Sequence, residues 1–104
     1  MQLAALEALE RGRYALSGDL VFDQVTRLLG EGDTAFAMLP HAEVDLAKVQ
    51  RVDSAGLALL LEWSIVAREG GRTIHYRNVP PALSALAGIS DVSALLVATA
   101  PGAA

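Results

Sequence analysis

Side chains that could support catalysis or bind a metal are sparse in this sequence. A nucleophilic triad could be assembled from Ser54, His75 and one of several carboxylates. The serine, however, lies in V-D-S-A-G rather than in the G-x-S-x-G turn that presents a hydrolase nucleophile. His41 and His75 each lack a neighbouring second ligand, there is no cysteine, and neither common phosphate-binding glycine motif is present. The sequence therefore predicts a protein that is not an enzyme and that holds no metal or cofactor.

Ser54 nevertheless stands where a hydroxyl group has consequences. The segment VQRVDSAGLALLLEW, residues 49–63, predicts a strand that ends at Asp53-Ser54 and a helix that begins at once. Ser and Asp both favour the N-cap, where a side-chain oxygen accepts a free backbone N–H and contributes about 1 kcal/mol. A phosphate is also tolerated there, because the helix dipole favours negative charge. Ser54 is thus either a structural cap or a switch, since phosphorylation would disrupt an interface formed at this point.

Composition excludes several other classes of protein. The 104 residues, 53% of them hydrophobic, suffice for one domain with one core. The formal charge of −4, with Lys48 as the only lysine, argues against binding to nucleic acid or anionic lipid. The longest aliphatic run, residues 55–65, is too short to span a bilayer. The N-terminal stretch, which carries Glu7 and Glu10, does not resemble a signal peptide. We expect a cytoplasmic domain that reaches a membrane only through a partner.

The hydrophobic patterns along the chain alternate between strand and helix. Residues 3–10 fit either a helix or the first arm of a hairpin that turns at Arg11-Gly12. Such alternation with short links favours one α/β domain over residues 1–104, built on a parallel or mixed sheet covered by helices. The other predicted elements are strands at 13–20, 42–49 and 72–79, helices at 22–30, 55–69 and 80–89, a last helix from residue 90, and a disordered tail from about residue 99.

Polar or small residues lie at or near the carboxyl ends of three predicted strands. These residues are Ser54, Asn78 and the pair Gly18-Asp19. Because the carboxyl ends of parallel strands meet at one edge of a sheet, where ligands and partners bind, we expect the functional surface at this edge.

The string from Val52 to Leu61 resembles the signature of STAS domains, which show an apolar strand, then D-S/T-x-G-[LI], then an aliphatic helix. In the MlaB-like branch, the small subunit of the Mla phospholipid-transport ABC complex, this corner tends to read V-D-[ST]-[AG]-G-L-A-L-L-L. The present chain matches that string at every position. The order of elements is also similar over nearly the whole chain. The resemblance implies a mixed sheet of about four strands flanked by about four helices, without catalysis or cofactor.

The resemblance implies two alternatives for Ser54. In the MlaB-like branch, this corner docks on an ABC ATPase subunit and through it on a membrane permease, at the inner membrane, in a complex that maintains outer-membrane lipid asymmetry. In the antagonist branch, a partner kinase phosphorylates the hydroxyl that matches Ser54 and is thereby released. Ala55 stands where antagonists favour a second serine, and Val21 stands where many members carry Asp. Both departures favour the transporter subunit.

The expected partner-binding surface is centred on Ser54. Leu57, Leu60 and Leu61 are expected in the core. Trp63 fits either the exposed side of the helix or the core, which an aromatic residue on such a helix favours, and Phe22 fits either core or surface. The remaining members of the expected surface are Asp53, Ala55 and Gly56 at the corner, Asp19 and Val21 near the first loop, and Glu62 on the exposed side of the helix.

Overall fold

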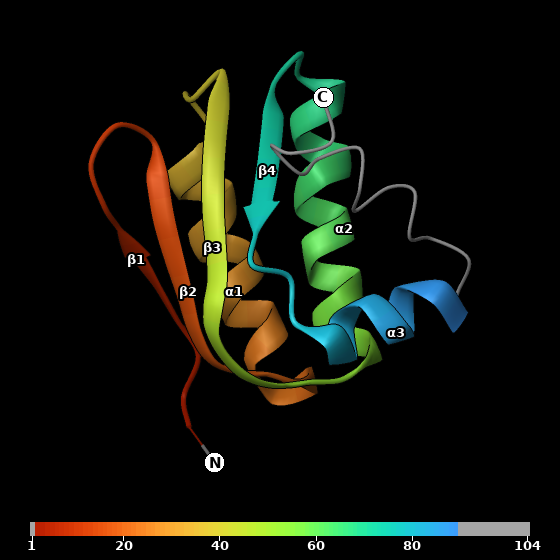
Figure 1. Ribbon diagram of the computed structural model, residues 1–104. Coiled ribbons are helices and arrows are strands. Elements are labelled where there is room, and N and C mark those ends of the chain that lie inside the picture. Colours follow the sequence, from red (N-terminus) through yellow and green to blue (C-terminus); the bar gives the residue numbers. More distant parts are fainter. Residues whose placement is uncertain (1, 90–104) are drawn as a thin grey trace.

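The computed structural model of the chain describes residues 2–89 (Figure 1). The predicted last helix and the predicted tail lie outside these residues. Four strands and three helices alternate along the described part: β1 (Ala5–Ala8), β2 (Arg13–Leu20), α1 (Phe22–Phe36), β3 (His41–Val52), α2 (Ser54–Glu69), β4 (Thr73–Arg77) and α3 (Pro81–Ile89).

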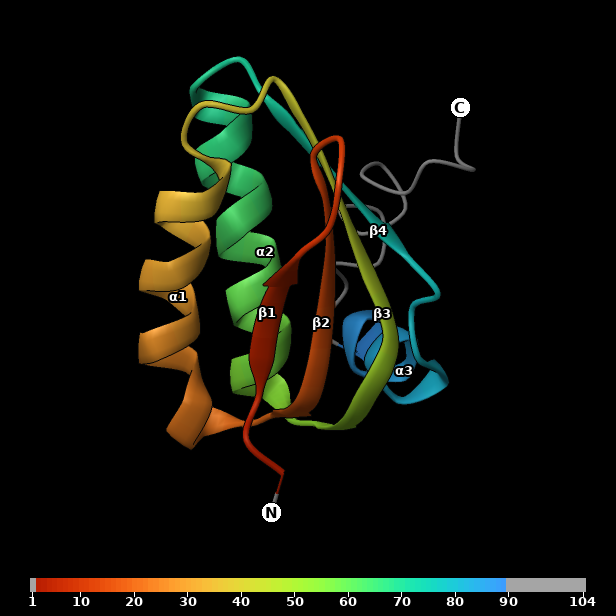
Figure 2. The ribbon, with the colours of Figure 1, turned by 90° about the vertical axis from the view of Figure 1, so that its left-hand side faces the viewer.

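The sheet has the strand order β1-β2-β3-β4. β2, β3 and β4 are parallel, whereas β1 pairs antiparallel with β2, so the sheet is mixed, as expected. Helices α1 and α2 cover one face of the sheet and α3 lies against the other (Figure 2). About four helices were expected, and three lie within residues 2–89. None of those three is long and apolar enough to cross a membrane.

The N-terminal segment adopts the hairpin alternative rather than a helix. β1 pairs with β2 from Ala5 opposite Ser17 to Ala8 opposite Tyr14. The turn between them places Arg11 and Gly12 at φ values of 61° and 74°. Glycine adopts this left-handed backbone without penalty, so Gly12 allows the reversal that keeps residues 5–8 extended.

Helix α1 does not stop at Gly30, as the sequence pattern predicted, but continues to Phe36. Its buried positions Gln24, Leu28, Gly32 and Phe36 recur at every fourth residue, which gives one continuous face toward the core. A Cβ on Gly32 would come within 2.2 Å of the Trp63 ring. Gly32 is therefore a contact point for an indole from α2 and does not end the helix.

Trp63 joins the two helices on this face of the sheet. Its side chain is 2% exposed, and its ring meets Phe36 edge to face with centroids 5.2 Å apart. Its Nε1 donates to the backbone oxygen of Leu29 at 3.4 Å. Of the two alternatives for Trp63, the structure therefore shows the core position, and Trp63 does not join the exposed side of the helix. Leu57 and Leu60 are also buried, whereas Leu61 is only partly so.

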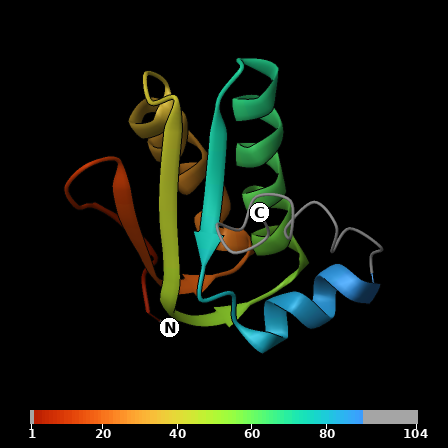
Figure 3. The same cartoon turned by 45° about the horizontal axis from the view of Figure 1, so that its top comes forward.

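Strand β3 is longer at both ends than the predicted 42–49. It lies between two parallel partners, pairing His41 with Thr73 of β4 at its start and Val52 with Leu20 of β2 at its end. β4 pairs only with the first half of β3, to Asp45, whereas the pairing with β2 continues to Val52. This longer pairing leads the chain to α2 at the end of the sheet where α3 lies (Figure 3).

Substitution by alanine is expected to have opposite effects on stability at the two glycines of α1, Gly30 and Gly32. A Cβ on Gly30 would meet nothing within 4 Å, whereas one on Gly32 would overlap the Trp63 ring. We expect Gly30→Ala to raise the free energy of unfolding by about 0.5–1 kcal/mol, because alanine favours the helix interior. Gly32→Ala should lower it by about 1–3 kcal/mol through overpacking. Urea denaturation followed by circular dichroism measures both. A stabilised Gly32→Ala would contradict the close helix contact.

Candidate functional site

Asp53 organises the junction between β3 and α2. Its Oδ1 accepts the backbone N–H of Gly56 at 3.0 Å, which makes Asp53 the N-cap of α2. Its Oδ2 accepts the backbone N–H of Phe22, the first residue of α1, at 3.1 Å. One carboxylate therefore binds the N-termini of two helices, where the helix dipoles favour negative charge. The N-cap of α1 itself, Val21, has no side-chain acceptor to offer.

Ser54 is the first residue of α2 and is exposed. Ser54 is therefore not the N-cap of α2, because Asp53 fills that role. Within residues 2–89 the Ser54 side chain makes no hydrogen bond to another side chain or to the backbone. Its hydroxyl faces outward from a helix N-terminus and is available to a partner or a modifying enzyme.

Gly56 is required by the fold rather than by a partner. It is buried, and a Cβ there would lie 2.2 Å from the backbone oxygen of Leu20 at the end of β2. The Asp53 backbone N–H also donates to Leu20 O at 3.2 Å. The first turn of α2 is thus seated directly on the end of β2. In the D-S-A-G segment, Asp53 caps the helix and the Ser54 hydroxyl is exposed. Ala55 is half-buried, and Gly56 allows the close contact with the Leu20 backbone.

Asp19 lies at the same edge but serves the interior. The sequence placed it on the partner-binding surface, yet it is only 3% exposed. Its Oδ2 accepts the Gln2 backbone N–H at 3.1 Å, and its own N–H donates to Gln2 O at 3.1 Å. Asp19 therefore fixes the N-terminal segment along the end of β2. Burial prevents direct contact between its carboxylate and a partner.

Glu62 shares a face of α2 with Ser54. Ser54, Ala58 and Glu62 are all exposed and recur at every fourth residue, so they follow one line along the helix. Eight residues of helix place Glu62 about 12 Å from Ser54. This geometry agrees with the expectation that the exposed side of α2 continues the corner surface, with Glu62 toward its margin.

Asn78 does not join this corner, although the sequence placed it at the same edge. It adopts a left-handed backbone with φ 55°, and its side chain donates to Asp45 Oδ1 at 2.9 Å. Asp45 lies in the first half of β3, well before the end of that strand at Val52. The hydrogen bond from Asn78, followed by one from the Ala47 backbone N–H, lowers the pKa of Asp45. β4 is simply shorter than β3, so its end falls beside the middle of its neighbour.

The residues considered for catalysis are not brought together. His75 stands opposite Glu43 in the register of β3 and β4, and its Nδ1 is buried with no hydrogen-bond partner. His41 Nδ1 lies 2.6 Å from the Thr73 hydroxyl at the other end of the strands from Ser54. Within residues 2–89, no three histidines or carboxylates gather as a metal site would need.

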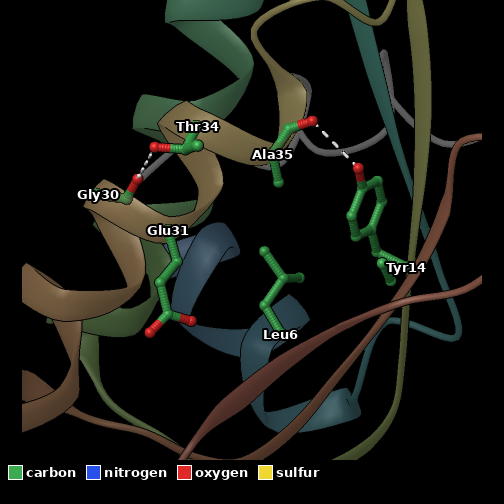
Figure 4. Close-up of a pocket in the computed structure, with 7 residues that line it drawn as sticks. Leu6, Tyr14, Gly30, Glu31, Thr34 and Ala35 are labelled. Atoms are coloured by element: carbon green, nitrogen blue, oxygen red, sulfur yellow. Dashed lines mark hydrogen bonds between the residues drawn. The ribbon is translucent and has the colours of Figure 1, made fainter.

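A groove of about 480 Å³ opens between the hairpin and α1, away from the corner. Leu6 points into it, and Tyr14, Glu31, Thr34 and Ala35 form its walls (Figure 4). The Tyr14 hydroxyl donates to Ala35 O and the Thr34 hydroxyl to Gly30 O. Glu31 pairs with Arg27 at 2.9 Å. Since each polar group already has a partner, the groove offers little to orient a substrate.

Two exposed apolar side chains at the corner were not assigned to the surface by the sequence. Phe22 is 74% exposed and Leu3 is 75% exposed. Phe22 fitted either core or surface, and the structure places it on the surface. The sequence gives no local signal for this exposure, because Phe22, Val25 and Leu28 follow an apolar helical spacing. In the structure, the buried row of α1 runs through Gln24 and Leu28 instead.

The corner geometry separates the roles of Asp53 and Ser54 in a testable way. We expect Asp53→Ala to lower the free energy of unfolding by about 2 kcal/mol, because two helix N-termini lose their acceptor. Ser54→Ala should change it by less than about 0.5 kcal/mol, since the side chain is exposed and unbonded. Thermal and urea denaturation of both variants measure the difference. Equal destabilisation by the two substitutions would show that Ser54 shares the capping role.

Comparison with known proteins places this fold and this corner in a family. No curated protein matches the chain in sequence. The structure of the anti-sigma factor antagonist SpoIIAA in its unphosphorylated form is similar in fold, with a TM-score of 0.64 and 17% identity over 80% of this chain and 79% of its own. The family described as the Mlab STAS domain matches residues 4–98. The chain therefore belongs to the STAS domains of the MlaB type.

Proposed function

We propose that this chain is a non-catalytic accessory subunit of a bacterial phospholipid-transport ABC complex of the Mla type. In this proposal it docks on the ATPase subunit through the Ser54 corner and supports its assembly and activity. It is then cytoplasmic and peripheral to the inner membrane, which it reaches through the ATPase and the permease. The complex would maintain the lipid asymmetry of the outer membrane.

The observation that carries the proposal is the exposed corner on a chain of MlaB type. The family match covers residues 4–98 and therefore includes every element of the corner. Asp53 caps the helix, so the outward side chain of Ser54 can change without loss of the fold. Ala55, half-buried beside it, contributes a methyl group suited to close packing. A rigid helix start with small side chains fits a docking surface that a partner approaches closely.

The second candidate is an anti-sigma factor antagonist switched by phosphorylation of Ser54. The fold likeness to SpoIIAA and the exposed hydroxyl favour it. Against it, the chain departs from the antagonist pattern at two positions near Ser54. Val21 and Ala55 replace polar residues that suit a kinase site.

Partner capture distinguishes the two candidates. The tagged full chain is recovered from its native cells in mild detergent, and mass spectrometry identifies its partners and the state of the Ser54 peptide. We expect an ABC ATPase with its membrane permease, and an unmodified Ser54. A soluble kinase that binds the unmodified chain and is lost when Ser54 carries phosphate would instead establish the antagonist.

A matched pair of substitutions tests the corner itself. We expect Ser54→Ala to change the dissociation constant for the purified ATPase subunit by less than about threefold, since only a hydroxyl is lost. Ser54→Arg should weaken binding at least about 100-fold through clash and burial of an unpaired charge. Titration calorimetry and the ATPase rate of the assembled complex measure both. Unimpaired binding by Ser54→Arg would place the interface elsewhere.

A further inference from the structure

Phe22 is held outward at the candidate docking corner. It opens α1, and its backbone N–H donates to the same Asp53 carboxylate that caps α2. The helix buries Gln24, Leu28 and the positions that follow at the same spacing. The Phe22 ring is not among these buried side chains and does not contribute to the core. An aromatic ring that is 74% exposed on a fixed backbone is costly in water and favourable in an interface.

Two further apolar residues, Leu3 and Val21, lie at the same end of the sheet as Phe22. The backbone of the N-terminal segment is fixed at the end of β2, because Gln2 bonds with Asp19 and the Ala4 N–H donates to the Gln24 side chain at 3.2 Å. Leu3, held between these bonds, is 75% exposed, and Val21 is half-buried. We call Leu3, Val21 and Phe22 the apolar corner patch.

The charge beside the patch indicates the chemistry of its partner. Asp23 follows Phe22, is exposed, and makes no ion pair in the part of the chain that the structure describes. The described ion pairs involve Arg13, Arg27 and Arg77, with Glu31 and Glu43 as their acids. A partner that covers Phe22 therefore gains by placing a cation opposite Asp23.

We propose that Phe22, flanked by Leu3 and Val21, is the anchor of the docking surface. It inserts into an apolar pocket of the partner that carries a lysine or arginine at its rim, opposite Asp23. The inference rests on the proposed function, so the partner is the ATPase subunit. A second copy of this chain and anionic lipid are both disfavoured as partners, because each would bring net negative charge to a chain of net charge −4.

The test compares two exposed apolar side chains at opposite ends of α1. Met38, 89% exposed, follows the far end of the helix, which is about 22 Å long. We expect Phe22→Ala to raise the dissociation constant for the purified ATPase subunit at least about tenfold. Phe22→Leu should recover part of this loss, and Met38→Ala should change the constant less than about twofold. Melting temperatures of all variants verify the fold.

Asp23→Asn supplies an independent readout of the rim charge. It should slow association with the ATPase subunit at low salt, and the difference from the wild-type chain should shrink as the ionic strength rises. Salt-independent association with no effect of Asp23→Asn would overturn the rim cation.

The outcomes separate failure of the anchor from failure of the proposed function. If Ser54→Arg abolishes binding and Phe22→Ala leaves it within threefold, docking at the corner stands and the anchor is overturned. If neither substitution weakens binding, the ATPase uses another surface and both proposals fall. If the wild-type chain does not bind the ATPase subunit but forms a dimer that Phe22→Ala dissociates, the patch serves self-association. This outcome overturns both the proposed function and the proposed partner chemistry.

Discussion

The shared Asp53 carboxylate is the interaction on which the corner of this domain depends. Its two oxygens accept backbone N–H groups from the first turns of α1 and α2, those of Phe22 and Gly56. A helix start needs acceptors for its free N–H groups, and a negative charge there also meets the helix dipole favourably. With Val21 as its N-cap, α1 cannot supply an acceptor from its own side chain. The positions of both helix starts are therefore set by one residue at the end of β3.

Because Asp53 carries the structural role, the residues around it are left free for contact. Ser54 points outward from a helix start that does not need its hydroxyl, and Phe22 points outward from a backbone that the same carboxylate holds. Gly56 lets α2 approach the Leu20 backbone, which brings these two helix starts to the same end of the sheet. The stability of the fold and the chemistry of the surface thus reside on neighbouring but different side chains.

Much of this architecture could be predicted from local patterns. The strand that leads to Asp53, the helix from Ser54 to Glu69 and the core position of Trp63 follow from hydrophobic periodicity and the glycines that end α2. The end of α1 could not be predicted, because Gly30 and Gly32 look like stop signals in sequence. Gly32 is explained only by the Trp63 ring, which arrives from another helix.

The site shows the same division between local and distant information. Asp53 and Ser54 are both good capping residues, and propensity alone does not choose between them. The choice is made by Phe22, whose N–H lies within reach of the Asp53 carboxylate only after the sheet has brought two distant segments together. Asn78 was expected near Ser54 because the ends of neighbouring parallel strands often lie at the same edge of a sheet. β4 is shorter than β3, however, and Asn78 at its end bonds with Asp45 instead.

The separation of roles at the corner also explains how one fold can serve both docking and switching. A phosphate on the outward hydroxyl would leave the Asp53 cap intact, so the domain would remain folded while the charge of its surface changed. A purely docking subunit needs the opposite, a corner whose small side chains stay uncharged. In this chain the corner that carries Ser54 includes the Ala55 methyl, Val21 and the exposed Phe22 ring. Such apolar groups strengthen a packed interface and do nothing to stabilise a phosphate, so the physical chemistry of the corner favours permanent docking over a reversible switch.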